Sequence, residues 1–289
     1  MNTLSVARLN LICAMVIWST IGVARRFIDL PSGVIALVRG VVGVLFLIAV
    51  VVALHKEFNW AKIKEHFGLL ALGGFFLGTN WALLFESYQH TSVAAAELSY
   101  YMNPVFIILL TPFILREHIR LHQWFCIVVA VAGMLLVNCS QGLSLSNEDA
   151  LGIGLALLAA LEVAGVVLCN KLIGNIGTYE RAITQLTVAT LALIPYTLAT
   201  EDLSTVTFQD VNSWFITLLV GIVHTGMAYY CYYIGLAGVP AQEVCILGYT
   251  DPILVILWGC LIFGETLNML QLFGAVLIVG SMLSMELRG

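Results

Sequence analysis

Seven ionisable side chains lie inside long apolar stretches of this chain, where each could carry a charge or exchange a proton. An ionisable group inside a bilayer is costly, so such residues are candidates for function. Glu86 and Glu243 lie within about one turn of the ends of their stretches, so we expect both carboxylates to snorkel to water. The full set is Arg39, Glu86, Glu97, Glu162, His224, Glu243 and Asp251.

Arg39 and Glu97 lie about five or six residues inside the same end of their stretches. Opposite charges at matching depth predict an ion pair, because pairing neutralises two costly groups at once. Such a pair is either a gate that closes one mouth of the protein or a fixed structural bridge. The sequence favours neither of these two roles.

Glu162 and His224 lie deeper, with other polar and aromatic residues at similar depth. Burial disfavours the ionised form of a carboxyl group, so Glu162 could exchange a proton, or its charged form could hold a cationic group. The alternative is a carboxyl that is hydrogen-bonded to a neighbouring helix. An aromatic pocket suits a flat or cationic solute or an amino acid. The candidate substrate-binding residues of this layer are Trp18, Asn80, Tyr101, Glu162, His224 and Tyr249.

Two prolines fall near the middle of apolar stretches, each after a polar residue, in Asn103-Pro104 and Asp251-Pro252. Proline removes a backbone hydrogen bond and kinks a helix, which would free the carbonyl of Tyr100 and its counterpart in the second stretch. A free carbonyl is tolerated within a membrane only where another group satisfies it. We therefore predict that Pro104 and Pro252 are hinges in a cavity wall; the alternative is a structural kink.

Other chemistries have no residue pattern to support them. The chain contains no GxxxxGK[ST] loop, no metal-ligand cluster and no nucleophile constellation, so we expect no cofactor, no metal and no catalytic residue. Its seven cysteines lie in apolar runs without a CxxC pair and are expected to be buried thiols. A lipid-modifying enzyme would need a catalytic pair near the headgroups, but Glu162 and His224 lie at mid-depth. We therefore predict that the protein is not an enzyme.

Membrane helices are the elements that must position these residues. Charged residues make up 10% of the chain and apolar residues 61%, whereas soluble domains contain roughly 25% charged residues. A helix needs about 20 apolar residues to cross the hydrocarbon. The predicted fold is an all-α membrane protein with ten transmembrane helices, at residues 7–24, 33–54, 67–88, 92–113, 121–139, 150–171, 178–199, 213–236, 241–262 and 268–286.

Basic residues are distributed unevenly among the segments that join these helices. With both termini in the cytoplasm, nine lysines and arginines lie inside, whereas only Arg25 and Arg26 lie outside. Cytoplasmic loops of membrane proteins carry the excess of Lys and Arg, so we predict that both termini are cytoplasmic. The inner set is Arg8, Lys56, Lys62, Lys64, Arg116, Arg120, Lys171, Arg181 and Arg288.

The sequence repeats itself with an offset of 148 residues, because residues 78–104 align without a gap with residues 226–252. Tyr101 and Tyr249 coincide in this alignment, as do Glu117 and Glu265 farther along. We divide the chain into a first repeat, residues 1–145, and a second, residues 146–289. Each half has five crossings, an odd number, so the second repeat is inverted in the membrane. Inverted repeats are typical of transporters whose site lies between the repeats.

Several motifs resemble the EamA-type proteins of the drug/metabolite transporter superfamily, and the likeness covers nearly the whole chain. Arg116 departs from the pattern, since glycine is usual before the acid, and Cys126 stands where the second repeat has Gly274. Both departures leave the implied fold intact. The matching residues are Trp18-Ser19-Thr20, Pro31, Arg39, the block from Ser92 through Asn103-Pro104 to Glu117 and Gln123, and the block from Gly264-Glu265-Thr266 to Ala275.

The resemblance implies a ten-helix exporter or exchanger of small metabolites. Helices 1, 3, 4, 6, 8 and 9 would surround the site, and helices 5 and 10 would serve packing or a homodimer. We predict a secondary transporter or facilitator of a small organic metabolite, such as an amino acid, in the cell inner membrane. Its partners would be this small molecule and the lipid bilayer, and no basic stripe indicates nucleic acid. The alternatives are a proton-coupled sugar or cation exporter and a lipid-modifying membrane enzyme.

Overall fold

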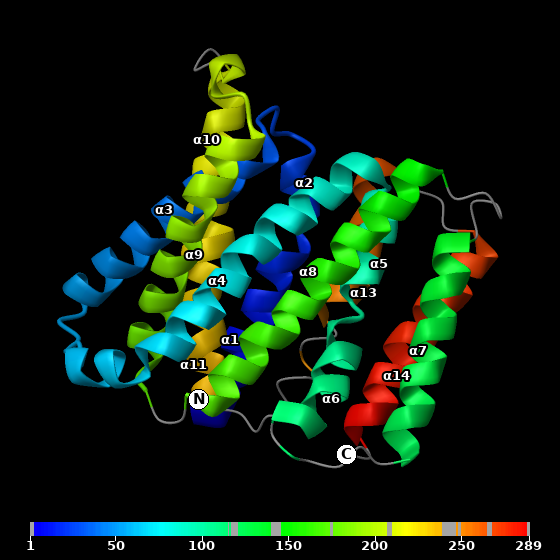
Figure 1. Ribbon diagram of the computed structural model, residues 1–289, viewed down its shortest axis with the longest axis horizontal. Coiled ribbons are helices and arrows are strands. Elements are labelled where there is room, and N and C mark those ends of the chain that lie inside the picture. The colour runs from blue at the N-terminus through cyan, green and yellow to red at the C-terminus, as the bar shows by residue number, and fades with distance from the viewer. Residues whose placement is uncertain are drawn as a thin grey trace.

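The computed structural model describes residues 3–114, 116, 121–139, 146–173, 176–206, 210–238, 247, 250–264 and 268–287 of the chain. All regular structure within these residues is helical (Figure 1). Three shorter apolar helices cover Val105–Ile114, Trp124–Leu136 and Met269–Ser281. The described helices that are long and apolar enough to cross a membrane are Ser5–Arg25, Ser32–Ala53, Trp60–His90, Asn147–Leu172, Thr178–Thr200 and Val211–Gly235.

The helices follow the predicted apolar stretches closely in both halves of the chain. The first half contains α1 (Thr3–Ser19), α2 (Ile21–Arg25), α3 (Ser32–Ala53), α4 (Trp60–His90), α5 (Val93–Tyr100), α6 (Asn103–Ile114) and α7 (Leu121–Cys139). The second half contains α8 (Asn147–Leu172), α9 (Thr178–Thr200), η1 (Leu203–Thr205), α10 (Val211–Val220), η2 (Gly221–Met227), α11 (Ala228–Gly238), α13 (Thr250–Phe263) and α14 (Met269–Leu287).

Three of the predicted continuous helices contain irregularities that the apolar pattern does not reveal. The predicted helix at 7–24 consists of α1 and α2, which Thr20 separates. The predicted helix at 92–113 consists of α5 and α6, which are separated by Tyr101 and Met102. The predicted helix at 213–236 contains the π-helical segment η2 between α10 and α11. Hydropathy depends on side-chain composition alone and does not report such changes in backbone hydrogen bonding. Short π-helical segments occur frequently at functional sites.

Polar side chains cap the N-termini of several helices, where backbone N–H groups need hydrogen-bond acceptors. The Ser146 Oγ accepts a hydrogen bond from the Asp149 N–H at 3.0 Å at the start of α8. The carboxylate of Asp210 accepts one from the Ser213 N–H at 3.2 Å at the start of α10. Each bond satisfies an N–H group that a helix start leaves unpaired. Hydrogen bonds from Ser213 also hold the pKa of Asp210 below its usual range.

The long helix α4 contacts both α8 and α9, and α3 packs against α9 and η2 (Figure 1). The approach of α4 to α9 depends on glycine, because a Cβ at Gly74 would lie 2.6 Å from the carbonyl oxygen of Gln185. The buried core that these helices share is rich in aromatic and aliphatic side chains. Its members include Ile35, Leu47, Trp81, Phe85, Leu186, Leu193, Tyr229 and Tyr233.

Helices α7 and α14 pack against each other at one side of the bundle and run in opposite directions (Figure 1). A Cβ at Gly133 would lie 2.7 Å from the carbonyl oxygen of Gly274, so the two backbones are close, as small residues permit in membrane helices. These are the fifth helices of the two halves, and their antiparallel course agrees with inverted repeats. The beginning of α1 and the end of α14 lie at the same end of the molecule (Figure 1).

Candidate functional site

Two carboxyl groups and two tyrosines form a cluster where α5 ends and α13 begins. The Tyr101 hydroxyl donates to Oδ2 of Asp251 at 2.9 Å, and the Tyr88 hydroxyl donates to Oε1 of Glu97. The Tyr101 N–H bonds to the Glu97 carbonyl, so these two residues lie one helical turn apart on one face. Glu97 and Tyr101 are both buried. The cluster therefore joins the first half of the chain directly to the second.

The helix is interrupted beside this cluster, between α5 and α6, where Pro104 was expected to disturb it. Pro104 is the second residue of α6 and Pro252 the third residue of α13, and proline is tolerated in a first helical turn. The Asn103 Nδ2 donates to the carbonyl oxygen of Tyr100 at 3.0 Å. The residue before the proline therefore satisfies the carbonyl that the proline was predicted to free. A hinge at Pro104 or Pro252 stays a prediction.

His224 lies in η2 and binds the first helix through two polar contacts. The Trp18 Nε1 donates to the His224 carbonyl oxygen at 2.9 Å, and Thr20 Oγ1 lies 2.9 Å from His224 Nε2. Thr20 Oγ1 also donates to the carbonyl oxygen of Ile17, so it accepts from the Nε2–H of the ring. The Nδ1 atom of His224 is buried and has no hydrogen-bond partner. Trp18 and His224, which the sequence placed in one layer, therefore contact each other.

Arg39 and Glu97 do not pair in this structure, contrary to the ion pair expected from their matching depth. The Arg39 Nε donates to Thr225 Oγ1 at 3.0 Å, and its guanidinium carbon lies 4.3 Å from the centroid of the Trp81 ring. Glu97 instead accepts its hydrogen bond from Tyr88. Depth along a helix says nothing about which face a side chain occupies, and here the two faces select different partners.

Asn80 connects α4 to α8 and lies beside the tyrosines of α5. Its Nδ2 donates to the carbonyl oxygen of Ala159 at 2.7 Å, and its Oδ1 lies 3.5 Å from the Tyr100 hydroxyl. The Tyr100 and Tyr101 rings have centroids 6.2 Å apart. The structure therefore brings Asn80 and Tyr101, two of the predicted site residues, into one neighbourhood.

Glu162 also lies in the contact between α4 and α8. Its Oε1 accepts a hydrogen bond from Thr79 Oγ1 at 2.8 Å. One turn before each partner stands a side chain that is about half exposed, Phe75 at 48% and Leu158 at 46%. Thr79 and Glu162 are themselves only partly exposed, and the second oxygen of Glu162, Oε2, is buried and has no hydrogen-bond partner. The bond to Thr79 corresponds to the alternative considered from sequence, a carboxyl bonded to a neighbouring helix.

An amide network that the sequence analysis did not identify links α8, α9 and α11. Gln185 is fully buried; its Oε1 accepts from the Tyr233 hydroxyl at 3.2 Å, and its Nε2 donates to Asn170 Oδ1 at 3.1 Å. The signal for it was present, since Asn170 and Gln185 are amides within apolar stretches.

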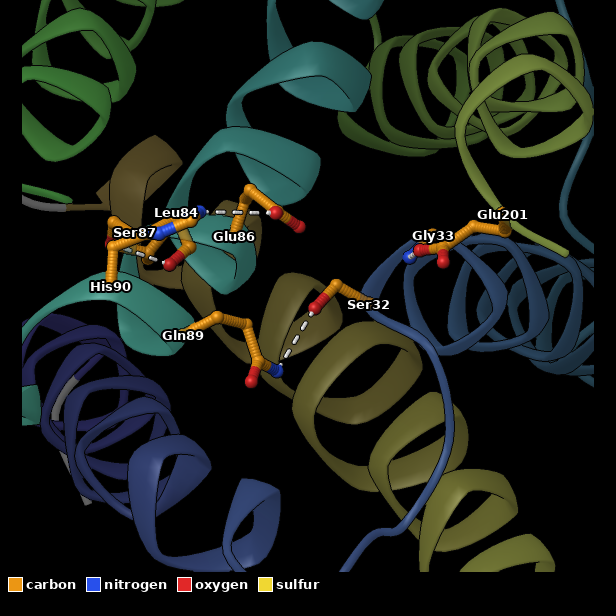
Figure 2. A network of polar contacts seen from close by, with 8 residues as sticks. All are labelled: Ser32, Gly33, Leu84, Glu86, Ser87, Gln89, His90 and Glu201. Atoms are coloured by element: carbon orange, nitrogen blue, oxygen red, sulfur yellow. Dashed lines mark hydrogen bonds and ion pairs between the residues drawn. The ribbon is translucent and has the colours of Figure 1, made fainter. Parts of the chain in front are cut away.

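An open cavity of about 760 Å³ lies at the end of the molecule opposite the start of α1. Its lining includes Arg25, Asp29 and Tyr88, so it leads toward the carboxyl–tyrosine cluster. Figure 2 shows polar contacts at this end of α3, α4 and α9: the Gln89 Nε2 donates to Ser32 Oγ, and the Gly33 N–H donates to Glu201. Glu86 is paired there with His90 at 3.4 Å (Figure 2) and is partly exposed, as snorkelling requires.

Several predicted residues cannot be located in this arrangement. Tyr249 and Glu243, together with Glu117 and Glu265, lie outside the described residues. Among the described residues, no group of three or more His, Cys, Asp or Glu side chains is arranged to hold a metal ion.

Comparison with known protein families identifies the fold. The EamA-like transporter family matches residues 6–139 and again residues 150–286. The chain belongs to the EamA-like transporter family. This EamA protein is therefore an all-helical, multi-pass membrane transporter with an EamA domain in each half, and it is not an enzyme. The family expected from the sequence motifs is confirmed.

Relatives and a solved structure agree with this membership. The chain is 31% identical over 284 residues to the "Uncharacterized transporter YxxF" of Bacillus subtilis, covering 96% of this chain and 88% of the relative. It is 27% identical over 253 residues to the "Pseudopaline exporter CntI" of Pseudomonas aeruginosa, covering 86% and 84%. One crystal structure superposes with a TM-score of 0.71 at 20% identity, covering 97% of this chain and 96% of that chain. This last likeness concerns the fold alone.

Proposed function

We propose that this EamA transporter is a secondary transporter or facilitator that exports a small organic metabolite, such as an amino acid. The substrate would occupy an aromatic cavity between the two halves and be released by alternating access. The polar contacts between Tyr101 and Asp251 and between Thr20 and His224 join side chains of opposite halves. Transporters built from inverted repeats bind substrate at such an interface, beside interrupted helices.

The single observation that carries this proposal is the Tyr101–Asp251 bond at the helix interruption. A buried tyrosine–carboxylate contact between two halves must be broken or rearranged when the halves move relative to each other. The interruption between α5 and α6 supplies a place for that movement, since Tyr101 and Met102 are not part of either helix. Hinges of this kind absorb backbone rotation at the ends of elements.

The bias of basic residues toward one face supports an orientation with both termini in the cytoplasm. With both termini cytoplasmic, the two repeats 1–145 and 146–289 enter from opposite faces, and the cavity that Arg25 and Tyr88 line opens to the outside. This arrangement would describe an outward-open conformation. The relative named as an exporter in Pseudomonas aeruginosa supports transport in that direction.

Transport in proteoliposomes tests the proposal. The purified chain would be reconstituted and loaded on one side with radiolabelled amino acids, polyamines, sugars or nucleotides, one at a time. We expect an amino acid or a related metabolite to cross faster than in liposomes without protein. If no solute of the panel crosses faster, the proposed cargo class is rejected. If a sugar crosses and no amino acid does, the sugar-exporter alternative is the better account.

A further inference from the structure

Glu97 is buried and Asp251 is partly buried, and these two carboxyl groups come from opposite halves of the protein. Glu97 is 5% exposed, and its Oε1 accepts a hydrogen bond from the Tyr88 hydroxyl. Asp251 accepts one from the Tyr101 hydroxyl at 2.9 Å through Oδ2. Tyr101 connects the two acids, because its N–H bonds to the Glu97 carbonyl oxygen and its hydroxyl bonds to Asp251. Each acid thus has one oxygen held by a tyrosine.

The second oxygen of Asp251 is the decisive feature. Oδ1 is buried and has no hydrogen-bond partner. A buried acceptor without a donor is costly, and such an atom in a native protein calls for an explanation. Because the Tyr101 hydroxyl fixes Oδ2, the unpartnered Oδ1 has a defined direction within the cluster. It is a prepared acceptor for a donor that is not part of the described chain.

Within the described residues, no cation forms an ion pair with either acid. The nearby Arg39 donates to Thr225 and stacks on Trp81, so its guanidinium is committed elsewhere. Two buried carboxyl groups that interact are unfavourable when both are ionised, unless a cation joins them. A positively charged group that donates hydrogen bonds would satisfy both acids in their ionised form.

We propose that Glu97 and Asp251 bind the ammonium group of the transported metabolite. An ammonium group has three N–H donors, which match Oδ1 of Asp251 and the carboxylate of Glu97. The rings of Tyr100 and Tyr101, whose centroids lie 6.2 Å apart, provide further attraction for a cation. Tyr88 both lines the outer cavity and bonds to Glu97, which connects the site to the outside.

This inference rests on the proposed transporter function and narrows its substrate class to amines and amino acids. It also gives Glu97 a role other than pairing with Arg39. A neutral pair of hydrogen-bonded carboxyls with a purely structural role is the competing account. The two accounts differ in what the site binds, so a binding measurement separates them.

Thermal stability of the purified full chain in detergent tests the site, because a ligand that binds the folded state raises the melting temperature. The probes are the amino acids, polyamines and phenethylamine, each compared with its counterpart in which hydroxyl or hydrogen replaces the amine. We expect stabilisation by ammonium compounds only. Asp251→Asn and Glu97→Gln should each weaken the apparent affinity about tenfold or more, since hydrogen bonds to charged groups contribute that much.

Two further variants keep the result interpretable. Asp202→Asn removes an exposed acid from the loop after α9 and should bind as the native chain does. Asp251→Glu keeps the charge and should bind better than Asp251→Asn, which a merely structural role would not require. The inference is overturned if the amine-free counterparts stabilise the native chain equally, if no ammonium compound does, or if both neutral variants keep the native affinity.

The same variants in proteoliposomes distinguish this inference from the function on which it rests. If the native chain moves an amine-free solute and both neutral variants move it equally fast, the transporter proposal stands and the ammonium site is overturned. If ammonium compounds stabilise the native chain but none is transported, the site is supported and the proposed transport of amines is rejected.

Discussion

The Tyr101 hydroxyl lies 2.9 Å from Oδ2 of Asp251 and joins the interrupted helix of the first half to α13 of the second. Each residue stands near the start of a helix with proline in its first turn, α6 for Tyr101 and α13 for Asp251. A movement of one half relative to the other must therefore stretch this bond. The contact couples the backbone interruption to the carboxyl groups of the site.

Replacing Tyr101 by phenylalanine removes this bond and keeps the ring. A buried carboxyl oxygen then lacks its donor, which should destabilise the folded protein by about 1–3 kcal/mol. We expect a lower melting temperature and altered transport kinetics in proteoliposomes. The matched control is the double variant Tyr101→Phe/Asp251→Asn. The double variant should lose less stability than the sum of the losses in the two single variants, because the effects of mutations at contacting residues are not additive. Additive losses would show that the contact contributes nothing.

The Arg39 side chain offers a second test, because its partner in the structure is Thr225 and not Glu97. Losses of stability from Arg39→Lys and Thr225→Val should couple by roughly 0.5–3 kcal/mol in a double-mutant cycle. Losses from Arg39→Lys and Glu97→Gln should add to within about 0.5 kcal/mol. Exchanging the two charges, as Arg39→Glu with Glu97→Arg, should not restore transport. Recovery by that exchange would favour a direct gate in another conformation.

Much of the fold could be predicted because membrane helices are specified by composition and length. The helices α3, α7, α9 and α14 begin and end within a few residues of the predicted stretches. The interruption at Tyr101 was indicated by Pro104, and Asn103 proved to be the group that satisfies the carbonyl of Tyr100. The π-helical segment η2 had no such signal, since no proline lies in it.

For the candidate site, the sequence predicted how deep each residue lies along its helix, but not which residues contact each other. Trp18 and His224, which the sequence placed at similar depth in their predicted stretches, are in contact, because Trp18 Nε1 donates to the His224 carbonyl oxygen. Depth did not identify the partner of Glu162, which is Thr79 of α4. A single sequence shows how far along a helix a residue stands. The rotation of each helix against its neighbours depends on packing of all the others, which one sequence does not display.

The topology prediction rests on the bias of basic residues toward one face. Single cysteines at Asn147 and Asp202, in a variant without other cysteines, should react with a membrane-impermeant maleimide added from outside intact cells. Both positions begin or follow a helix at the end of the molecule opposite the start of α1. A cysteine at Lys56 serves as the inside control and should react only after permeabilisation. Labelling with the reverse pattern would place both termini outside.

Asp210 makes the stability of the loop before α10 sensitive to acid. Hydrogen bonds from Ser213 lower the pKa of Asp210 in the folded state, so the folded protein binds this proton less readily than the unfolded chain does. The contribution to stability is therefore present above the unfolded pKa of about 3.9 and is lost as the pH falls through the folded value. Asp210→Asn keeps an acceptor for α10 but cannot titrate. The melting temperature of this variant should fall less steeply than that of the native chain between about pH 5 and pH 3, the range in which Asp210 titrates. An unchanged slope would mean that other acids determine the response.

The role that sequence suggested for Glu162 differs from the contact that the structure gives it. Its depth suggested a proton carrier or a substrate anchor, whereas in the structure its Oε1 accepts a hydrogen bond from Thr79 of α4. We expect Glu162→Gln to transport within about twofold of the native rate, since a glutamine oxygen can accept the same bond from Thr79. The pH dependence of transport, measured in proteoliposomes with and without a pH gradient, should also be unchanged. Thr79→Val is the matched variant, and it should lower the melting temperature without altering that dependence. A Glu162→Gln variant that is inactive, or that no longer responds to the gradient, would return Glu162 to the transport pathway.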